Sequence, residues 1–427
     1  MNDEQTRALG DLDALTKSIR RLAESGGCGA ELPQLVGELL GGFRRRVRRL
    51  PDGRRDALRQ WRNSVLSVDP RRLPFFCGLR VRIWRWRLRR FPRIVETLAY
   101  WLGVMAFFRR MNRGAKRVLT FHNVMPDAMC VCDMASGVTM PASQFDGLIG
   151  RLKRRYRFSA DFGDPSTLTV TFDDGYRCQF ETAGEILERH GVPAVVFASG
   201  DAMAADEPCR ALVVDRLLYW ASYAPMSALS AFAGAEVTSR ASFWHEFMNP
   251  AYRRDAAARG EGVFARADAL WPFAKIVGSL DPEMTRLRLT GPDPVRVEHL
   301  RRRGWKVGWH TKTHFPLACL PDADAERELT PSDASCLEVP MSFPYGVPES
   351  VSVRDEEIAR AKGYPGALSN LSCANDREGD FFMLRFSPTG DAVEDEAMLS
   401  GFRYFLECGH LMRRVARRNN GQLEGKR

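Results

Sequence analysis

The stretch TVTFDDGY, residues 169–176, joins a strand-forming run to two adjacent acids and a glycine. Its first four residues are β-branched or aromatic, which favours a strand. Asp173 and Asp174 follow at once, and two like charges side by side repel each other unless their surroundings hold them. A strand end that carries such a pair predicts a functional site.

Strand-like and helix-like segments alternate around this stretch from residue 118 onward. Strand-like runs lie at 117–124, 167–174, 192–199, 305–311 and 337–343, with a weaker one at 366–370. Helix-like periodicity lies between them, at 143–156, 180–191, 293–304 and 349–363. Glycines stand where these helices are expected to end, at Gly191, Gly304 and Gly363. The alternation predicts an α/β fold of parallel βα units, whose reactive residues collect at the carboxyl ends of the strands.

A second polar motif, HTKTH, follows the strand-like run at 305–311. His310 and His314 are four residues apart, so on a helical turn both imidazoles face one side and can chelate a single ion. One carboxylate and two imidazoles form a common site for zinc, iron, manganese or cobalt. We expect Asp174 to complete this site, while Asp173 stays ionised and takes a proton from the attacking water. Taken singly, paired acids also suit a helix cap, and HxxxH also occurs by chance.

TFDDGY followed by HTKTH resembles the first two motifs of the polysaccharide deacetylase family, the NodB-homology domains. LTFHNV (119–124) is similar to the first strand of the family, and VPAVVFAS (192–199) to the strand after the paired acids. SFPYG (342–346) is similar to the third motif. The resemblance covers roughly 118–390. It implies a distorted (β/α)7 barrel and metal-dependent removal of an N-acetyl group from an amino sugar, usually N-acetylglucosamine in a glycan.

The resemblance also implies a role for each matched residue. Asp173 corresponds to the catalytic base, and the metal ligands correspond to Asp174, His310 and His314. Zinc is the expected ion, with cobalt, manganese, iron or nickel as alternatives. Tyr345 corresponds to the residue whose backbone N–H helps to hold the oxyanion, and Pro344 fixes the chain before it.

Two departures from the family pattern concern the base and the general acid. Ser342 stands where many members carry an arginine that orients the base. The late Leu-x-Ile-His motif is not evident, and MLRFSP (383–388) is its nearest counterpart. There Arg385 resembles a late arginine site that orients Asp173 or meets an anionic substrate, with a surface ion pair as the alternative. The general acid is unassigned, and His122 lines the substrate pocket or packs in the core.

Positive charge is concentrated in the first part of the chain. Residues 1–117 hold 27 Lys+Arg and 11 Asp+Glu, whereas the other 310 residues hold 36 and 42. Such a basic segment suggests an anionic neighbour, either a membrane surface or nucleic acid. We expect a basic, mainly helical extension at 1–113 and a deacetylase-like domain at 114–392, interrupted by an insertion at about 203–292. A C-terminal helix and basic tail follow at 393–427.

Two stretches of the basic segment have an unusual composition. RVRIWRWRLRR (80–90) alternates arginine with apolar residues in places, and this period of two suggests a strand. Its tryptophans suit a membrane interface or stacking on bases, and packing on the body is the alternative. IVETLAYWLGVMAFF (94–108) is shorter than the about 20 residues of a spanning helix. A packed helix, a helix in a membrane surface and a true span all remain open.

The N-terminal residues and the cysteines bear on location. The first residues include acids and no apolar run, so no secretory signal is expected. Ten cysteines are scattered without a CxxC pair, which favours a reducing compartment. We therefore expect a cytoplasmic protein, peripheral at the inner face of the cell membrane through 44–113.

The motifs favour a hydrolase acting on an N-acylated amino sugar in a polysaccharide, an oligosaccharide or a lipid-linked glycan. Two alternatives come from other classes of protein. One is an inactive barrel that binds glycans, and the other is a protein that binds membranes or nucleic acid through its basic arm. Nucleic acid is the weakest of these, because only the basic arm supports it.

Overall fold

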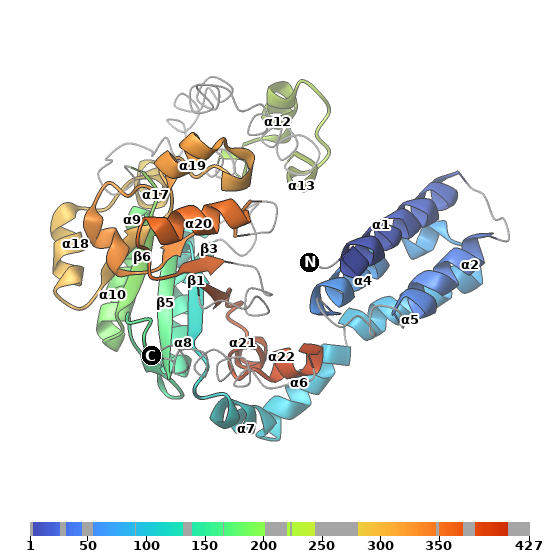
Figure 1. Cartoon of the computed structure of the whole chain (residues 1–427), viewed down its shortest axis with the longest axis horizontal. Helices are drawn as coiled ribbons and strands as arrows, with labels where there is room; N and C mark the ends of the chain where they lie inside the picture. The colour runs from blue at the N-terminus through green and yellow to red at the C-terminus, as the bar shows by residue number, and fades with distance from the viewer. Residues whose placement is uncertain are drawn as a thin grey trace. The chain divides into compact units, whose positions relative to one another are not determined.

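The computed structural model describes residues 3–25, 31–44, 54–89, 91–130, 139–164, 166–200, 220–222, 224–243, 281–346, 350–369 and 381–408. The chain divides into two compact units (Figure 1). The described part of the first unit lies in residues 3–112 and 396–408, and that of the second in 113–395. The domain boundaries expected from the sequence stay a prediction.

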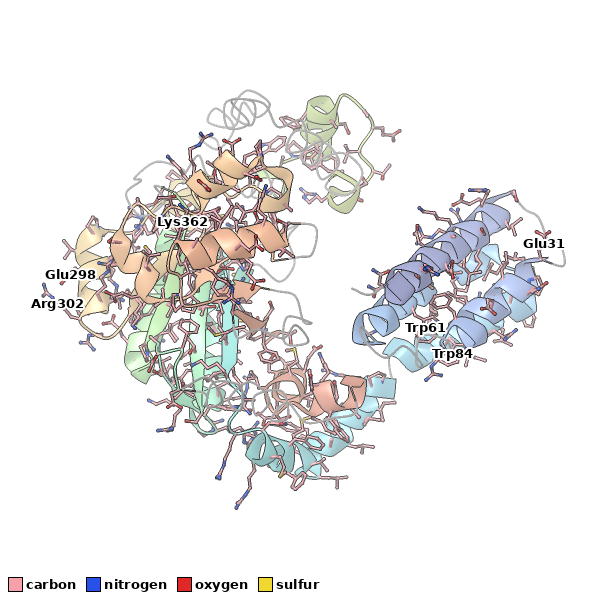
Figure 2. All side chains as sticks on the ribbon, viewed as in Figure 1. Glu31, Trp61, Trp84, Glu298, Arg302 and Lys362 are labelled. Atoms are coloured by element: carbon pink, nitrogen blue, oxygen red, sulfur yellow. The ribbon has the colours of Figure 1, made fainter. Side chains whose placement is uncertain are left out.

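The first unit contains helices and connecting turns in its described residues. The elements are α1 (Asp3–Glu24), α2 (Glu31–Gly37), the π-helical η1 (Glu38–Gly42), α4 (Arg54–Ser67), the 3-10 helix η2 (Pro70–Arg72), α5 (Phe75–Arg89), α6 (Phe91–Trp101), α7 (Val104–Met111) and α22 (Phe402–Cys408). Apolar residues at helical spacing, among them Leu12 and Ile19, form a buried core. Trp61 and Trp84 meet edge to face there, with ring centroids 5.6 Å apart (Figure 2).

The strand expected for residues 80–90 is wrong, because the described part of this stretch belongs to α5. Cys77, Val81 and Trp84 follow helical spacing and pack in the core of the first unit. The arginines between them lie towards solvent or along the edges of the helix. Arginine is a good helix former, and its long stem covers apolar surface while its charge stays in water. A short alternation with arginine therefore does not distinguish a strand from a helix.

Residues 94–108 form parts of two short helices. α6 ends at Trp101 and α7 begins at Val104. Gly103 lies between them with φ of +74°, a left-handed conformation that interrupts the helix without the steric cost a side chain would add. None of the described helices combines the length and apolar character needed to cross a bilayer.

The second unit alternates strands and helices (Figure 1). Its strands are β1 (Arg117–Phe121), β2 (Asn123–Met125), β3 (Thr139–Pro141), β4 (Arg157–Phe158), β5 (Thr167–Asp174), β6 (Ala194–Ala198), β7 (Lys306–Trp309), β8 (Met341–Ser342), β9 (Ala367–Ser369) and β10 (Phe382–Phe386). Its α-helices are α8 (Ala142–Lys153), α9 (Arg177–Phe180), α10 (Thr182–His190), α12 (Met226–Ala233), α13 (Arg240–Ser242), α17 (Pro282–Leu289), α18 (Pro294–Arg301), α19 (Asp322–Glu328) and α20 (Val353–Ala361). A further helix, α21 (Ala392–Leu399), begins in the second unit and ends in the first.

Eight of these strands form one sheet in the order β7-β6-β5-β1-β10-β9-β8, with β4 added beside β5. Every pairing is parallel, and β1 lies between β5 and β10. The predicted α/β fold with a parallel sheet is confirmed. In the described residues no backbone pairing joins β7 to β8, so closure into a (β/α)7 barrel stays a prediction.

The predicted helices of the second unit are present, and their predicted glycine ends adopt positive φ, at Gly191, Gly304 and Gly363. Glu298 and Arg302 form an ion pair one turn apart at the outer end of α18 (Figure 2). The strand expected at 337–343 is shorter, because 334–338 form a 3-10 helix and only β8 pairs. β10 was not expected as a strand. The expected insertion lies largely outside the described residues, which include α12, α13 and α17 of it.

Candidate active site and metal centre

The paired acids lie at the carboxyl end of β5, which is buried along its whole length. Phe172 on this strand stacks with Trp305, with ring centroids 6.3 Å apart. Asp174 has φ of +82° and Gly175 has φ of +91°, so the chain turns sharply as it leaves the sheet. The apolar run thus anchors the strand and places two buried carboxylates at the carboxyl edge of the sheet, where the chain turns.

Asp174, His310 and His314 come together at this edge. Asp174 Oδ1 lies 3.6 Å from His310 Nε2 and 3.4 Å from His314 Nε2. One ligand atom from each residue lies within 4.8 Å of the others. Because zinc binds nitrogen and oxygen at about 2.0–2.2 Å, three ligand atoms this close can share one ion. The donor set therefore fits a divalent metal.

The imidazole of His310 is oriented by the backbone of β8. Its Nδ1 lies 2.7 Å from the carbonyl oxygen of Ser342 and donates to it, which leaves the lone pair on Nε2 towards Asp174. Burial lowers the pKa of His310 to about 4, against smaller opposing effects of Asp173 and of this hydrogen bond. A neutral, pre-oriented imidazole is the form that binds a metal.

The loop that carries the histidines differs from the helical turn expected for HTKTH. Thr311 has φ of +65° and His314 has φ of +58°, so the two rings meet through left-handed backbone rather than through helical spacing. Glu328 on α19 holds this loop, because its carboxylate accepts from the Thr313 backbone N–H at 2.7 Å and from the Thr313 hydroxyl at 2.6 Å. No motif marks Glu328 in the sequence.

The strained backbone of the described residues is concentrated at this site. The non-glycine residues with positive φ are Asp174, Thr311, His314 and Tyr345. Such conformations cost on the order of 1–3 kcal/mol each and persist where the surrounding structure enforces them. The ring of Tyr345 lies against that of His314, with centroids 4.9 Å apart, and Pro344 precedes it in the buried wall. The third motif therefore adjoins the proposed ligands.

Asp173 pairs with a buried arginine from β10. Arg385 Nη1 lies 2.7 Å from Asp173 Oδ1, and both side chains are almost completely buried. Burial alone would raise the pKa of Asp173, but the charge of Arg385, helped by His310 and His122, outweighs it and holds the pKa well below its usual range. Asp173 is therefore a carboxylate at neutral pH. His122 Nε2 lies 3.9 Å from its other oxygen, Oδ2.

Gln179 on α9 is a buried residue that the sequence analysis missed. Its side-chain amide donates to the backbone carbonyl of His122 at 2.8 Å and to that of Asp173. It thus ties the end of β1 to the end of β5. A polar residue in a four-residue helix carries no periodic signal, so only the fold reveals it.

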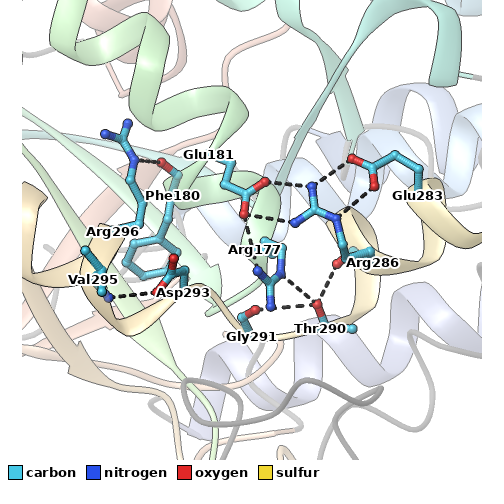
Figure 3. A network of polar contacts seen from close by, with 10 residues as sticks. All are labelled: Arg177, Phe180, Glu181, Glu283, Arg286, Thr290, Gly291, Asp293, Val295 and Arg296. Atoms are coloured by element: carbon cyan, nitrogen blue, oxygen red, sulfur yellow. Dashed lines mark hydrogen bonds and ion pairs between the residues drawn. The ribbon is translucent and has the colours of Figure 1, made fainter.

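A charged network fixes the last part of the expected insertion, α17 and Thr290, beside α9 (Figure 3). Arg286 bridges Glu181 and Glu283, with contacts of 2.8 Å and 2.7 Å. The Arg177 backbone N–H donates to the carbonyl of Thr290 at 2.8 Å, and its Nε donates to the Thr290 hydroxyl at 3.0 Å. The network holds α17 against the helix that leaves the paired acids.

Comparisons with known proteins add a structural likeness. No family model and no curated protein matches the chain. It is similar to the solved structure of the Streptococcus pyogenes deacetylase PplD in complex with acetate (12% identity, TM-score 0.37, covering 67% of this chain and 97% of that one). It is also similar to a de-N-acetylase from Aggregatibacter actinomycetemcomitans (14% identity, TM-score 0.38, covering 65% of this chain and 98% of that one).

A polysaccharide deacetylase from Bacillus cereus is a further match (14% identity, TM-score 0.37, covering 66% of this chain and 68% of that one). All three of these solved structures are described as deacetylases or de-N-acetylases.

Proposed function

We propose that this protein is a metal-dependent hydrolase that removes an N-acyl group, foremost N-acetyl, from an amino sugar of a glycan. The observation that carries the proposal is the convergence of Asp174, His310 and His314 within 4.8 Å. An ionised acid, Asp173, directly precedes Asp174 in the chain. A binding module has no need of this additional buried carboxylate and its arginine.

Each residue of the site has a distinct task in this proposal. Asp174, His310 and His314 hold one divalent ion, zinc in the first place. When bound, the ion lowers the pKa of a water molecule and polarises the amide carbonyl. Asp173 accepts the proton of the attacking water, and Arg385 keeps this base ionised and oriented. The backbone N–H of Tyr345 donates to the developing oxyanion.

His122 supplies the proton that the leaving amine needs. It lies on the side of Asp173 away from Arg385, and about a quarter of its side chain is exposed. An imidazole can carry a proton near neutral pH, which an acid paired with arginine cannot. This assignment fills the role left open by the missing Leu-x-Ile-His motif.

Two neighbouring substitutions with the same chemistry test the proposal. Asp173→Asn should lower the rate of acetate release from N-acetylglucosamine oligomers by about 10²–10⁴-fold, because a general base is lost. Its metal content, measured by mass spectrometry, should equal that of the wild type. Asp174→Asn should lose both metal and activity. Equal behaviour of the two variants would contradict the division of roles.

The same assay separates the enzyme from an inactive glycan-binding barrel. We expect the metal-loaded wild type to release acetate from at least one member of a panel of N-acetyl oligosaccharides and lipid-linked glycans. Glycan binding without acetate release from any member would favour the binding barrel instead.

A further inference from the structure

Helix α6 buries a charged residue and exposes large apolar residues, which reverses the usual arrangement of a surface helix. Its buried residues include Glu96, which forms a two-point ion pair with Arg403 of α22 at 2.7 Å and 2.8 Å. Its solvent side carries Ile94, Leu98 and Trp101, and Trp101 is 78% exposed. A surface helix of a water-soluble fold normally has its apolar stripe inside and its charges outside. The acid of α6 is inside, and three of its large apolar residues are outside.

Helix α7 continues this apolar surface. Its inner side packs through Phe108 on Phe402 of α22, with ring centroids 5.2 Å apart. Its outer side exposes Val104 and Phe107, and Leu102 in the turn before it is 77% exposed. We use the name α6–α7 apolar face for six residues: Ile94, Leu98, Trp101, Leu102, Val104 and Phe107. These residues follow one another at helical spacing and across a single turn.

The second unit offers a comparison for this face. Its exposed large apolar residues in the described part are Val295 and Val353, on separate helices. Single exposed apolar residues are ordinary on a protein surface, whereas a contiguous group of large ones marks an interaction site. The α6–α7 apolar face is of the second kind.

The charges around this face select an anionic partner. Glu96 is the one acid in the sequence between residues 91 and 113, and its charge is neutralised by Arg403. Arg110 in the last turn of α7 and Arg113, two residues after its end, are exposed. Tryptophan and arginine together are typical of the boundary between lipid headgroups and acyl chains. α6 has 11 residues and extends about 16 Å at 1.5 Å per residue, about half the thickness of a bilayer core.

We propose that the α6–α7 apolar face docks on the surface of an anionic lipid bilayer. Trp101, Leu102 and Phe107 enter the boundary between headgroups and acyl chains, and the helices lie along the surface without crossing it. Arg110 and Arg113 contact lipid phosphates. This inference rests on the first unit and on Arg113, the residue that follows it in the chain, and does not depend on the proposed hydrolysis.

The full-length protein is tested by flotation with two kinds of vesicle. One is phosphatidylcholine alone, and the other is an equal mixture of phosphatidylcholine and phosphatidylglycerol. We expect binding to the mixed vesicles that weakens as salt is added. Trp101→Ser with Leu102→Ser should weaken it at least about 10-fold, since two large apolar groups lose their burial. The matched control, Val295→Ser with Val353→Ser, should bind as the wild type does.

A second variant, Arg110→Glu with Arg113→Glu, tests the role of charge. It should abolish the preference for anionic vesicles. Because all these positions are exposed, circular dichroism and thermal unfolding should match the wild type. The proposal is overturned if the wild type fails to float with mixed vesicles, or if the Trp101 and Leu102 variant floats equally well. A wild-type dimer that this variant converts to a monomer, without lipid binding, would assign the face to a second copy of the chain.

Discussion

Among the described ion pairs, Glu96 with Arg403 in the first unit and Asp173 with Arg385 in the second both have a buried acid, and the two pairs differ in how the arginine donors are used. In the first unit Arg403 donates two N–H groups to the two oxygens of Glu96. In the second unit Arg385 donates one group to Asp173, and its buried Nε and Nη2 make no hydrogen bond to any described residue. A two-point pair satisfies both partners and holds helices together. The one-point pair leaves buried polar groups whose cost is expected at a functional site.

The largest effect should come from Arg385→Leu, which leaves Asp173 buried without its partner. Breaking a buried pair in this way costs about 3–5 kcal/mol of folding free energy, measurable by urea unfolding. The pKa of Asp173 should also rise, because burial then acts without the compensating positive charge. Since protonated Asp173 cannot accept a proton, the acid limb of kcat/KM should move to higher pH.

The lowered pKa of Asp173 also determines how the stability of the fold changes with pH. In the wild type, ionised Asp173 stabilises the folded state fully at pH values above 3.8, the ordinary pKa of an aspartate. This contribution is lost as the pH falls through the lowered pKa of the folded state. Arg385→Lys keeps a positive charge, so its acid limb should shift less than that of Arg385→Leu. If the pH profile of Arg385→Leu equalled that of the wild type, Arg385 would not be needed to keep Asp173 ionised for catalysis.

A smaller effect is expected for Arg403→Leu, which removes the partner of Glu96. Since part of Arg403 is exposed, water can reach the pair, and we expect a loss of about 1–3 kcal/mol by urea unfolding. Acetate release per folded molecule should keep its rate and its pH profile. If Arg403→Leu moved the acid limb as Arg385→Leu does, the contrast between a structural pair and a functional pair would fail.

The smallest effect is expected for Gln179→Leu, a change that acts on the base through its backbone. We expect kcat to fall about 10-fold, equivalent to about 1.4 kcal/mol, with KM and metal content unchanged. Gln144→Leu is the matched control, because Gln144 also donates to a carbonyl, that of Thr389 at 2.9 Å, but at an exposed position. Loss of metal from Gln179→Leu would point to a general structural role.

The sequence alone determined the features that depend on near neighbours in the chain. Alternating apolar runs and helical periodicity predicted the parallel α/β fold, because side-chain spacing reports which face of an element is buried. The run before Asp173 predicted a buried strand with acids at its end. Glycines predicted the ends of three helices, since a left-handed residue there favours the absence of a side chain.

Only the tertiary structure decided which distant residues meet. Arg385 reaches Asp173 because β10 and β5 both lie beside β1, an order that no local pattern encodes. Glu328 and Gln179 act through backbone groups brought near them by packing, and HTKTH approaches Asp174 through left-handed backbone. The same holds for 80–90, where burial of Val81 in the helical core overrode an alternating pattern. Periodicity is a property of adjacent residues, whereas strand order and burial come from the free energy of the whole fold.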